Sequence, residues 1–157
     1  MTPLGRFHDL TSRGLFALAG GALVAALFLY VFEVIARYLF AAPTVWSGEA
    51  VQYALAVVIF TALPEITRRG AHVAIDMVPE ALSGRPALWL GRFNVAIATL
   101  ACATAAGIVG KESLIQFRRG LMTNAAIPVP RWWITAIIAL GLASAALHLA
   151  RRFARPL

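Results

Sequence analysis

Long apolar runs alternate with short polar segments along the whole chain. Four runs contain no Asp, Glu, Lys or Arg, at residues 14–32, 50–64, 93–110 and 132–150. None of them shows the polar residue on every turn that is typical of a soluble amphipathic helix. At about 1.5 Å of rise per residue, three of the runs can cross a hydrocarbon core of about 30 Å. The second run is shorter and reaches full length only if Glu49 or Glu65 lies at a membrane surface, or if protein shields its ends.

Proline, glycine and charged residues set the limits of the helices. We expect one transmembrane domain over residues 1–157, with helices at roughly 14–38, 46–67, 86–118 and 131–152. Gly120 fits a helix C-terminal cap, and Pro128 and Pro130 separate the third helix from the fourth. A short amphipathic segment is expected between the second and third helices.

The first apolar run follows Arg6 and Arg13, as the core of a secretion signal would. Its length exceeds the roughly 7–15 residues of a signal core, and no convincing small-residue cleavage site follows it. We therefore expect this run to be retained as the first membrane helix.

The composition supports the membrane assignment and excludes other classes. The chain has 157 residues, of which 61% are hydrophobic and 13% charged, with a mean hydropathy of +0.78. Soluble domains carry about 25% charged residues. A soluble enzyme, a nucleic-acid-binding protein and a disordered linker are all disfavoured. The net charge is +7, and the basic residues lie mostly between the apolar runs. This placement indicates a role in setting the membrane topology and in contacting phospholipid headgroups.

The distribution of basic residues predicts the orientation. If the N-terminus is cytoplasmic, nine of the 14 basic residues fall on the cytoplasmic side: Arg6, Arg13, Arg68, Arg69, Arg85, Arg92, Arg151, Arg152 and Arg155. The positive-inside rule then places both termini in the cytoplasm.

Charged residues near the helix ends are the first candidates for function. Glu33 and Arg37 are four residues apart, so they share a helix face and can pair. A helix-end or partner-contacting ion pair is favoured over proton coupling, because Glu33 lies near the interface and has a ready partner. Trp46 is placed at interface depth, Glu49 in the first turn of the second helix, and Gln52 on a packing face.

Further polar residues follow the second helix. Glu65 lies one turn from Arg68 and Arg69, and we expect a solvated charge cluster there. His72 and Asp76 are interpreted as an interfacial pair. A metal site needs three or more ligands, and His8 and His148 are distant in sequence, so no metal is expected.

Several features expected of other functions are absent from the sequence. There is no Gly-rich phosphate loop, nucleophile elbow or broken helix with polar groups at mid-membrane. The chain is therefore not expected to be an enzyme or to bind a cofactor, and the apolar helix centres favour a scaffold over a pore. Small residues between 101 and 110 predict a close helix approach in the third helix.

An ordered set of short motifs carries a family resemblance. Arg37–Tyr38–Leu39–Phe40 closes the first helix; then come Pro43, Trp46, Glu49, Arg69, His72–Val73, Asp76, Ile127–Pro128 and Trp132–Trp133. In this order the chain resembles the small membrane subunit of tripartite ATP-independent periplasmic (TRAP) transporters, the DctQ-like family, over essentially its whole length. Pro64–Glu65 departs from the family pattern, where small and apolar residues are more usual.

The resemblance implies a subunit of the bacterial inner (cytoplasmic) membrane that works through other proteins. Its partners would be a large TRAP membrane subunit, which carries the substrate and sodium sites, and a periplasmic substrate-binding protein that delivers an organic acid. The small subunit would enlarge the static scaffold of this sodium symporter, with its first two helices against the large subunit. Basic residues facing the periplasm would form a docking surface, namely Lys111, Arg118, Arg119 and Arg131.

Two other functions remain open. The chain could be a self-contained, homodimeric, proton-coupled exporter with four helices, which would need a membrane-embedded glutamate such as Glu33. Against this, Glu33 is displaced toward the helix end and is followed by Arg37. A bare membrane anchor or assembly factor is the third possibility.

Overall fold

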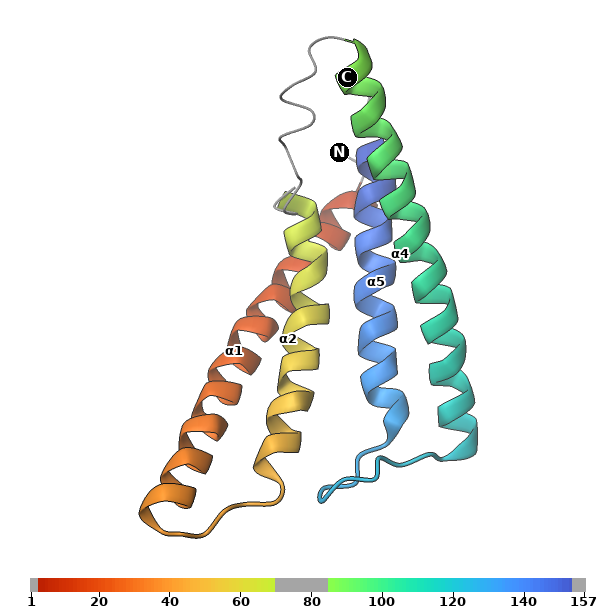
Figure 1. The fold of residues 1–157 in the computed structure, drawn as a ribbon. Coiled ribbons are helices and arrows are strands. Elements are labelled where there is room, and N and C mark those ends of the chain that lie inside the picture. Colours follow the sequence, from red (N-terminus) through yellow and green to blue (C-terminus); the bar gives the residue numbers. More distant parts are fainter. Residues whose placement is uncertain (1–2, 70–84, 154–157) are drawn as a thin grey trace.

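The computed structural model describes residues 3–69 and 85–153, which form four long helices (Figure 1). These are α1 (Pro3–Leu39), α2 (Ser47–Arg69), α4 (Arg85–Arg119) and α5 (Arg131–Phe153). All four are long and apolar enough to cross a membrane. The described ranges hold no strand, only an isolated bridge between Met122 and Pro130. The prediction of an all-α, four-helix membrane protein is confirmed.

The helix limits differ most from expectation at the N-terminus. Helix α1 begins at Pro3, where we expected residue 14, and at about 1.5 Å per residue it is some 55 Å long. Helix α2 continues through Pro64 to Arg69. Gly120 ends α4 as expected: its φ is 60°, and Leu121 N donates to Gln116 O at 3.1 Å. The amphipathic segment expected after α2 lies outside the described residues.

The helices form two antiparallel hairpins, α1–α2 and α4–α5, that meet where α2 packs on α5. We call the end where α1 begins and α5 ends the terminal end. The opposite end, with the connections at 40–46 and 120–130, is the connection end. In Figure 1, α1 lies close to α5 only at the terminal end and diverges from it toward the connection end.

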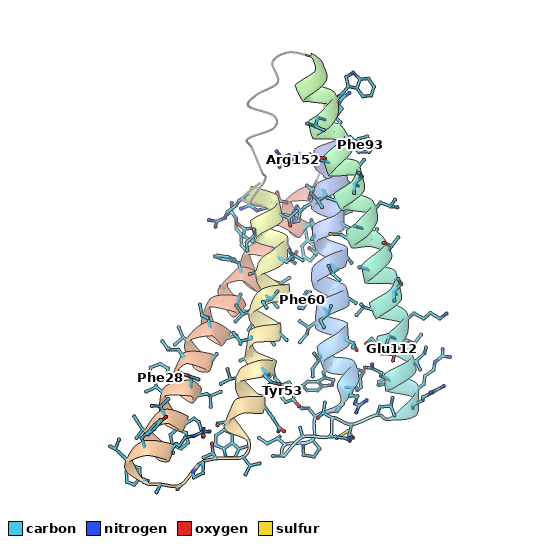
Figure 2. All side chains as sticks on the ribbon, viewed as in Figure 1. Phe28, Tyr53, Phe60, Phe93, Glu112 and Arg152 are labelled. Carbon is cyan, nitrogen blue, oxygen red and sulfur yellow. The ribbon has the colours of Figure 1, made fainter. Side chains whose placement is uncertain are left out.

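A single narrow stripe of α1 is buried. Ser12, Ala19, Ala26 and Glu33 are buried and follow one another at intervals of seven residues, the repeat of left-handed helix packing. Small residues along such a stripe let two helix backbones approach closely in lipid. The other faces of α1 are open: Phe28, labelled in Figure 2, is 71% exposed. The most apolar stretch of α4 has no buried residue.

The closest backbone approach joins α2 to α5. A Cβ atom added at Gly141 of α5 would lie 2.2 Å from the carbonyl oxygen of Phe60 in α2. Pro64 has no N–H to donate to this carbonyl four residues earlier, so the helix leaves the oxygen free to face α5. The small residues of α4 give a looser contact: a Cβ at Gly107 would meet nothing within 4 Å, and one at Gly110 would lie 3.8 Å from the Cβ of Ala139 in α5. The predicted approach through residues 101–110 is therefore present at Gly110, where α4 packs on α5, but the tightest crossing joins α5 to α2.

Gly141→Ala should destabilise the chain, because the added methyl group cannot fit against the Phe60 carbonyl without separating α2 from α5. We expect a loss of about 1–3 kcal/mol in the free energy of unfolding, measured by thermal or denaturant unfolding in detergent. Gly107→Ala is the matched control, since it adds the same group in open space. Equal stability of the two variants would contradict the crossing.

Candidate functional site

Polar and charged side chains gather at the two ends of the bundle, as Figure 2 shows. At the connection end, the carboxylate of Glu33 binds the turn between α1 and α2. Its Oε1 accepts from Arg37 Nη2 at 2.6 Å and from Arg37 Nε at 3.2 Å. Its Oε2 accepts from Ser47 Oγ at 2.7 Å, from Thr44 N at 3.1 Å and from the Thr44 hydroxyl. The predicted Glu33–Arg37 pair is present. The contacts to Thr44 and Ser47 had no sequence signal.

Glu49 links the two hairpins at the same end. Its Oε2 accepts from Ala126 N at 2.7 Å and from Ile127 N at 3.4 Å, both in the connection that leads to α5. We expected Glu49 only to favour the start of α2. The additional bonds come from residues far away in sequence, so the spacing around Glu49 could not indicate them.

The other candidate contacts of a partner subunit face outward. The Arg37 side chain is 56% exposed although it pairs with Glu33. Trp46 is 37% exposed and its ring lies 6.2 Å from that of Phe32, centroid to centroid. Gln52 is also exposed on α2. Of the five residues singled out here by sequence, three can therefore reach another molecule.

Four basic residues surround the end of α4 and the start of α5. Lys111, Arg118, Arg119 and Arg131 are all exposed, and within the described ranges none of them forms an ion pair. Buried polar contacts hold the two helix ends together beneath them. Ser113 Oγ donates to Trp132 O at 3.0 Å, and Thr135 Oγ1 donates to Gln116 Oε1 at 3.0 Å.

At the terminal end, Glu65 is fully buried at 0% exposure. It accepts from Arg68 Nη2 at 2.5 Å and from Arg69 Nε at 2.8 Å. The prediction of a solvated charge cluster was wrong for the carboxylate, because Glu65 follows Thr61 by four residues on the buried face of α2. Arg69 itself is exposed and lies 5.3 Å over the ring of Phe16.

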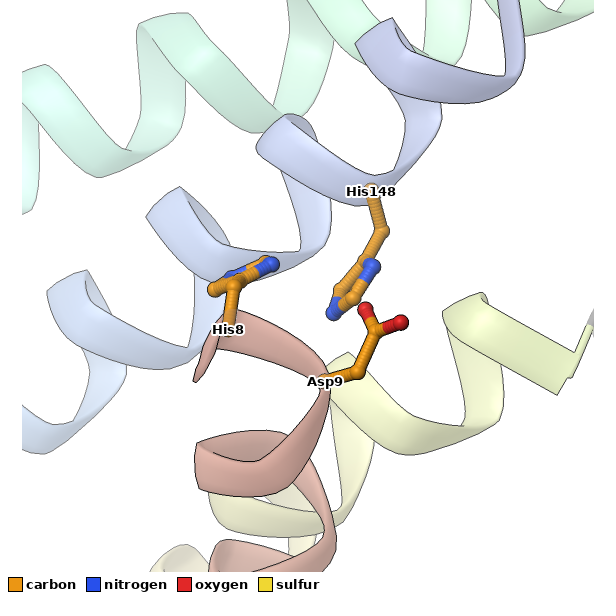
Figure 3. Close-up of side chains that lie close together, drawn as sticks. All are labelled: His8, Asp9 and His148. Atoms are coloured by element: carbon orange, nitrogen blue, oxygen red, sulfur yellow. The ribbon is translucent and has the colours of Figure 1, made fainter. Parts of the chain in front are cut away.

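Two histidines that are distant in sequence meet at the terminal end. His8 of α1 and His148 of α5 stack with their ring centroids 4.1 Å apart, and Figure 3 shows Asp9 beside them. His8 Nε2 lies 2.9 Å from Ser144 Oγ, and His148 Nε2 lies 2.8 Å from Ser12 Oγ. These histidines are distant in sequence, so their spacing along the chain gave no indication that they would meet. His72 and Asp76 lie outside the described residues.

Glu33→Ala should destabilise the α1–α2 hairpin, because Arg37, Thr44 and Ser47 all lose their acceptor. We expect a clearly lower melting temperature of the purified chain, with a smaller decrease for Glu33→Gln, which keeps one acceptor oxygen. Gln52→Ala, an exposed change on the same hairpin, should leave the melting temperature unchanged. Stability of Glu33→Ala equal to that of Gln52→Ala would show that the carboxylate does not hold the turn.

The sequence also matches the model of a known protein family. Residues 26–157 match the model described as "Tripartite ATP-independent periplasmic transporters, DctQ component". Among the curated proteins, no relative matches the chain. Since the match covers most of the sequence and includes all four helices at least in part, the chain belongs to the DctQ family, the small membrane component of TRAP transporters.

Proposed function

We propose that this chain is the static scaffold subunit of a TRAP transporter and itself carries no transport site. In this role it supports a large transport subunit in sodium-coupled uptake of an organic acid, which a periplasmic binding protein delivers. The observation that carries the proposal is the placement of the described polar groups. Carboxylates such as Glu33, Glu49 and Glu65 lie at the ends of the bundle, where they hold its own turns and helices.

The state of Glu33 favours a scaffold over a proton-coupled exporter. An exporter needs a membrane carboxylate that can exchange protons and ligands. Glu33 instead forms an ion pair with Arg37 and accepts hydrogen bonds from Thr44 and Ser47. The pocket between α2 and α5 is lined by apolar side chains and Tyr53, which does not suit an ion site.

The outward surface of the chain suits a large membrane partner. Helices α1 and α4 direct most of their apolar residues away from the bundle. We assign the α1–α2 hairpin to the large subunit, with exposed Arg37, Trp46 and Gln52 at its edge. Phospholipids cover the remaining apolar faces.

The orientation follows from the basic residues. With both termini in the cytoplasm of the bacterial inner membrane, the connection end faces the periplasm. Lys111, Arg118, Arg119 and Arg131 then present unpaired positive charge to an approaching binding protein. Arg69, with His72 and Asp76, belongs to the cytoplasmic interface.

Affinity purification of the C-terminally tagged chain from its native membrane in mild detergent should recover a much larger polytopic protein. Trp46→Ala should lower the yield of that protein, because it removes an exposed aromatic side chain from the proposed interface. Trp133→Ala is the matched control, an exposed tryptophan at the same end of the bundle on α5. Recovery of the chain alone as a dimer would refute the scaffold function and favour the exporter.

The double variant Arg118→Glu with Arg119→Glu reverses two charges. It should reduce organic-acid uptake several-fold without lowering the amount of membrane complex. The physical reason is the loss of electrostatic attraction for the binding protein. Arg152→Glu is the control, because Arg152 is an exposed cation at the opposite end of the bundle. Unchanged uptake in the double variant would show that docking occurs elsewhere.

A further inference from the structure

The cluster at the terminal end contains the side chains of a metal site. His8, Asp9 and His148 each place one potential ligand atom within 4.8 Å of the others. Two imidazoles and one carboxylate are a common protein ligand set for Zn²⁺, with water in the remaining position. The three residues come from two helices, α1 and α5, and Figure 3 shows them close together.

The hydrogen bonds define which nitrogen of His8 carries a lone pair. Arg151 Nη1 lies 3.1 Å from His8 Nδ1. A guanidinium can only donate hydrogen bonds, so Nδ1 accepts, and the proton of the neutral ring is on Nε2. That Nε2–H points to Ser144 Oγ at 2.9 Å. Ser144 therefore fixes the ring in the orientation that turns its lone pair toward Arg151.

The hydrogen bonds of Ser12 define the lone pair of His148. Ser12 has one hydroxyl proton and donates it to the carbonyl oxygen of His8 at 2.9 Å. Its oxygen, 2.8 Å from His148 Nε2, must therefore accept from that nitrogen. The lone pair of the neutral His148 ring is then on Nδ1. Each imidazole has one nitrogen bonded to a serine, the kind of support that orients histidines in metal sites.

Arg151 already occupies a cation position in this cluster. Its Nη1 lies 3.1 Å from His8 Nδ1 and 3.2 Å from Asp9 Oδ1. The lone pair of His8 and the carboxylate of Asp9 therefore both contact the positively charged guanidinium of Arg151. A dipositive ion at the same place would gain more from both ligands, and Arg151 would move away from it.

We propose that His8, Asp9 and His148 form a binding site for one divalent transition-metal ion of the Zn²⁺ class, in which the Arg151 guanidinium is the competing cation. Ligand atoms around tetrahedral zinc lie about 3.3 Å apart, from bond lengths of about 2.0 Å. The observed spacing of up to 4.8 Å is wider than this value, so the three side chains must move closer together when an ion binds. The bound ion joins the first turns of α1 to the last turns of α5, which are far apart in sequence.

The test uses the full chain, purified in detergent with a tag that contains no histidine and then freed of metal with a chelator. Co²⁺ is the probe, because its visible absorption spectrum reports coordination by histidine and carboxylate. We expect one Co²⁺ per chain, displaced by Zn²⁺. His8→Ala and His148→Ala should each weaken binding by about tenfold or more. Glu112→Ala is the control, since it removes an exposed carboxylate at the opposite end of the bundle and should leave binding unchanged.

The variant Arg151→Ala distinguishes a metal site from a cluster that only holds α1 and α5 together. Removing the competing cation should tighten Co²⁺ binding several-fold, an effect that misfolding cannot produce. The proposal is overturned if Co²⁺ gives no ligand-field spectrum, if binding survives in His148→Ala, or if Arg151→Ala weakens it.

Discussion

The contact between Gly141 of α5 and the Phe60 carbonyl of α2 is the interaction on which the rest of the bundle depends. Within the described residues, α2–α5 is the principal packing between the two hairpins. Pro64 frees the carbonyl by removing its helical donor, and the missing side chain of Gly141 lets the helices approach it. In lipid, helices gain little from burying apolar groups against each other, so close packing of this kind decides their association. Polar contacts at both ends, such as Glu49 with Ala126 and Ser12 with His148, join the same two hairpins.

Three carboxylates stabilise the ends of this packed centre. Glu33 holds the α1–α2 turn, Glu49 holds the connection to α5, and Glu65 binds the last turn of α2. Glu33 and Glu65 are buried and Glu49 is half-buried, and a buried carboxylate is unfavourable unless several donors surround it. Each of these three accepts at least two hydrogen bonds. These three carboxylates therefore hold the turns and helix ends of the chain itself. The outer faces of the helices remain free to contact other molecules.

The distribution of burial fits the role of a scaffold. Helix α1 contributes one seven-residue stripe to its own bundle, and α4 buries nothing in its most apolar stretch. Buried polar side chains such as Glu33 and Glu65 form hydrogen bonds within the bundle, and the open faces of α1 are apolar. A small subunit that enlarges a static membrane domain needs such a surface, since it must meet lipid on one side and a larger protein on another.

The sequence by itself determined the class of protein, the four helices and the local pairs. The apolar runs indicate the membrane helices, and the Glu33–Arg37 pair lies within about one helix turn. Each of these features depends only on residues that are neighbours in the sequence. The ordered motifs at the helix ends also carried the family. Only the tertiary structure decided that Glu65 is buried, that Gly141 meets Phe60, and that His8 meets His148. These contacts join residues on different helices, and their positions depend on how two hairpins cross. Helix periodicity fixes which residues share a face, but it does not fix which face of another helix they meet.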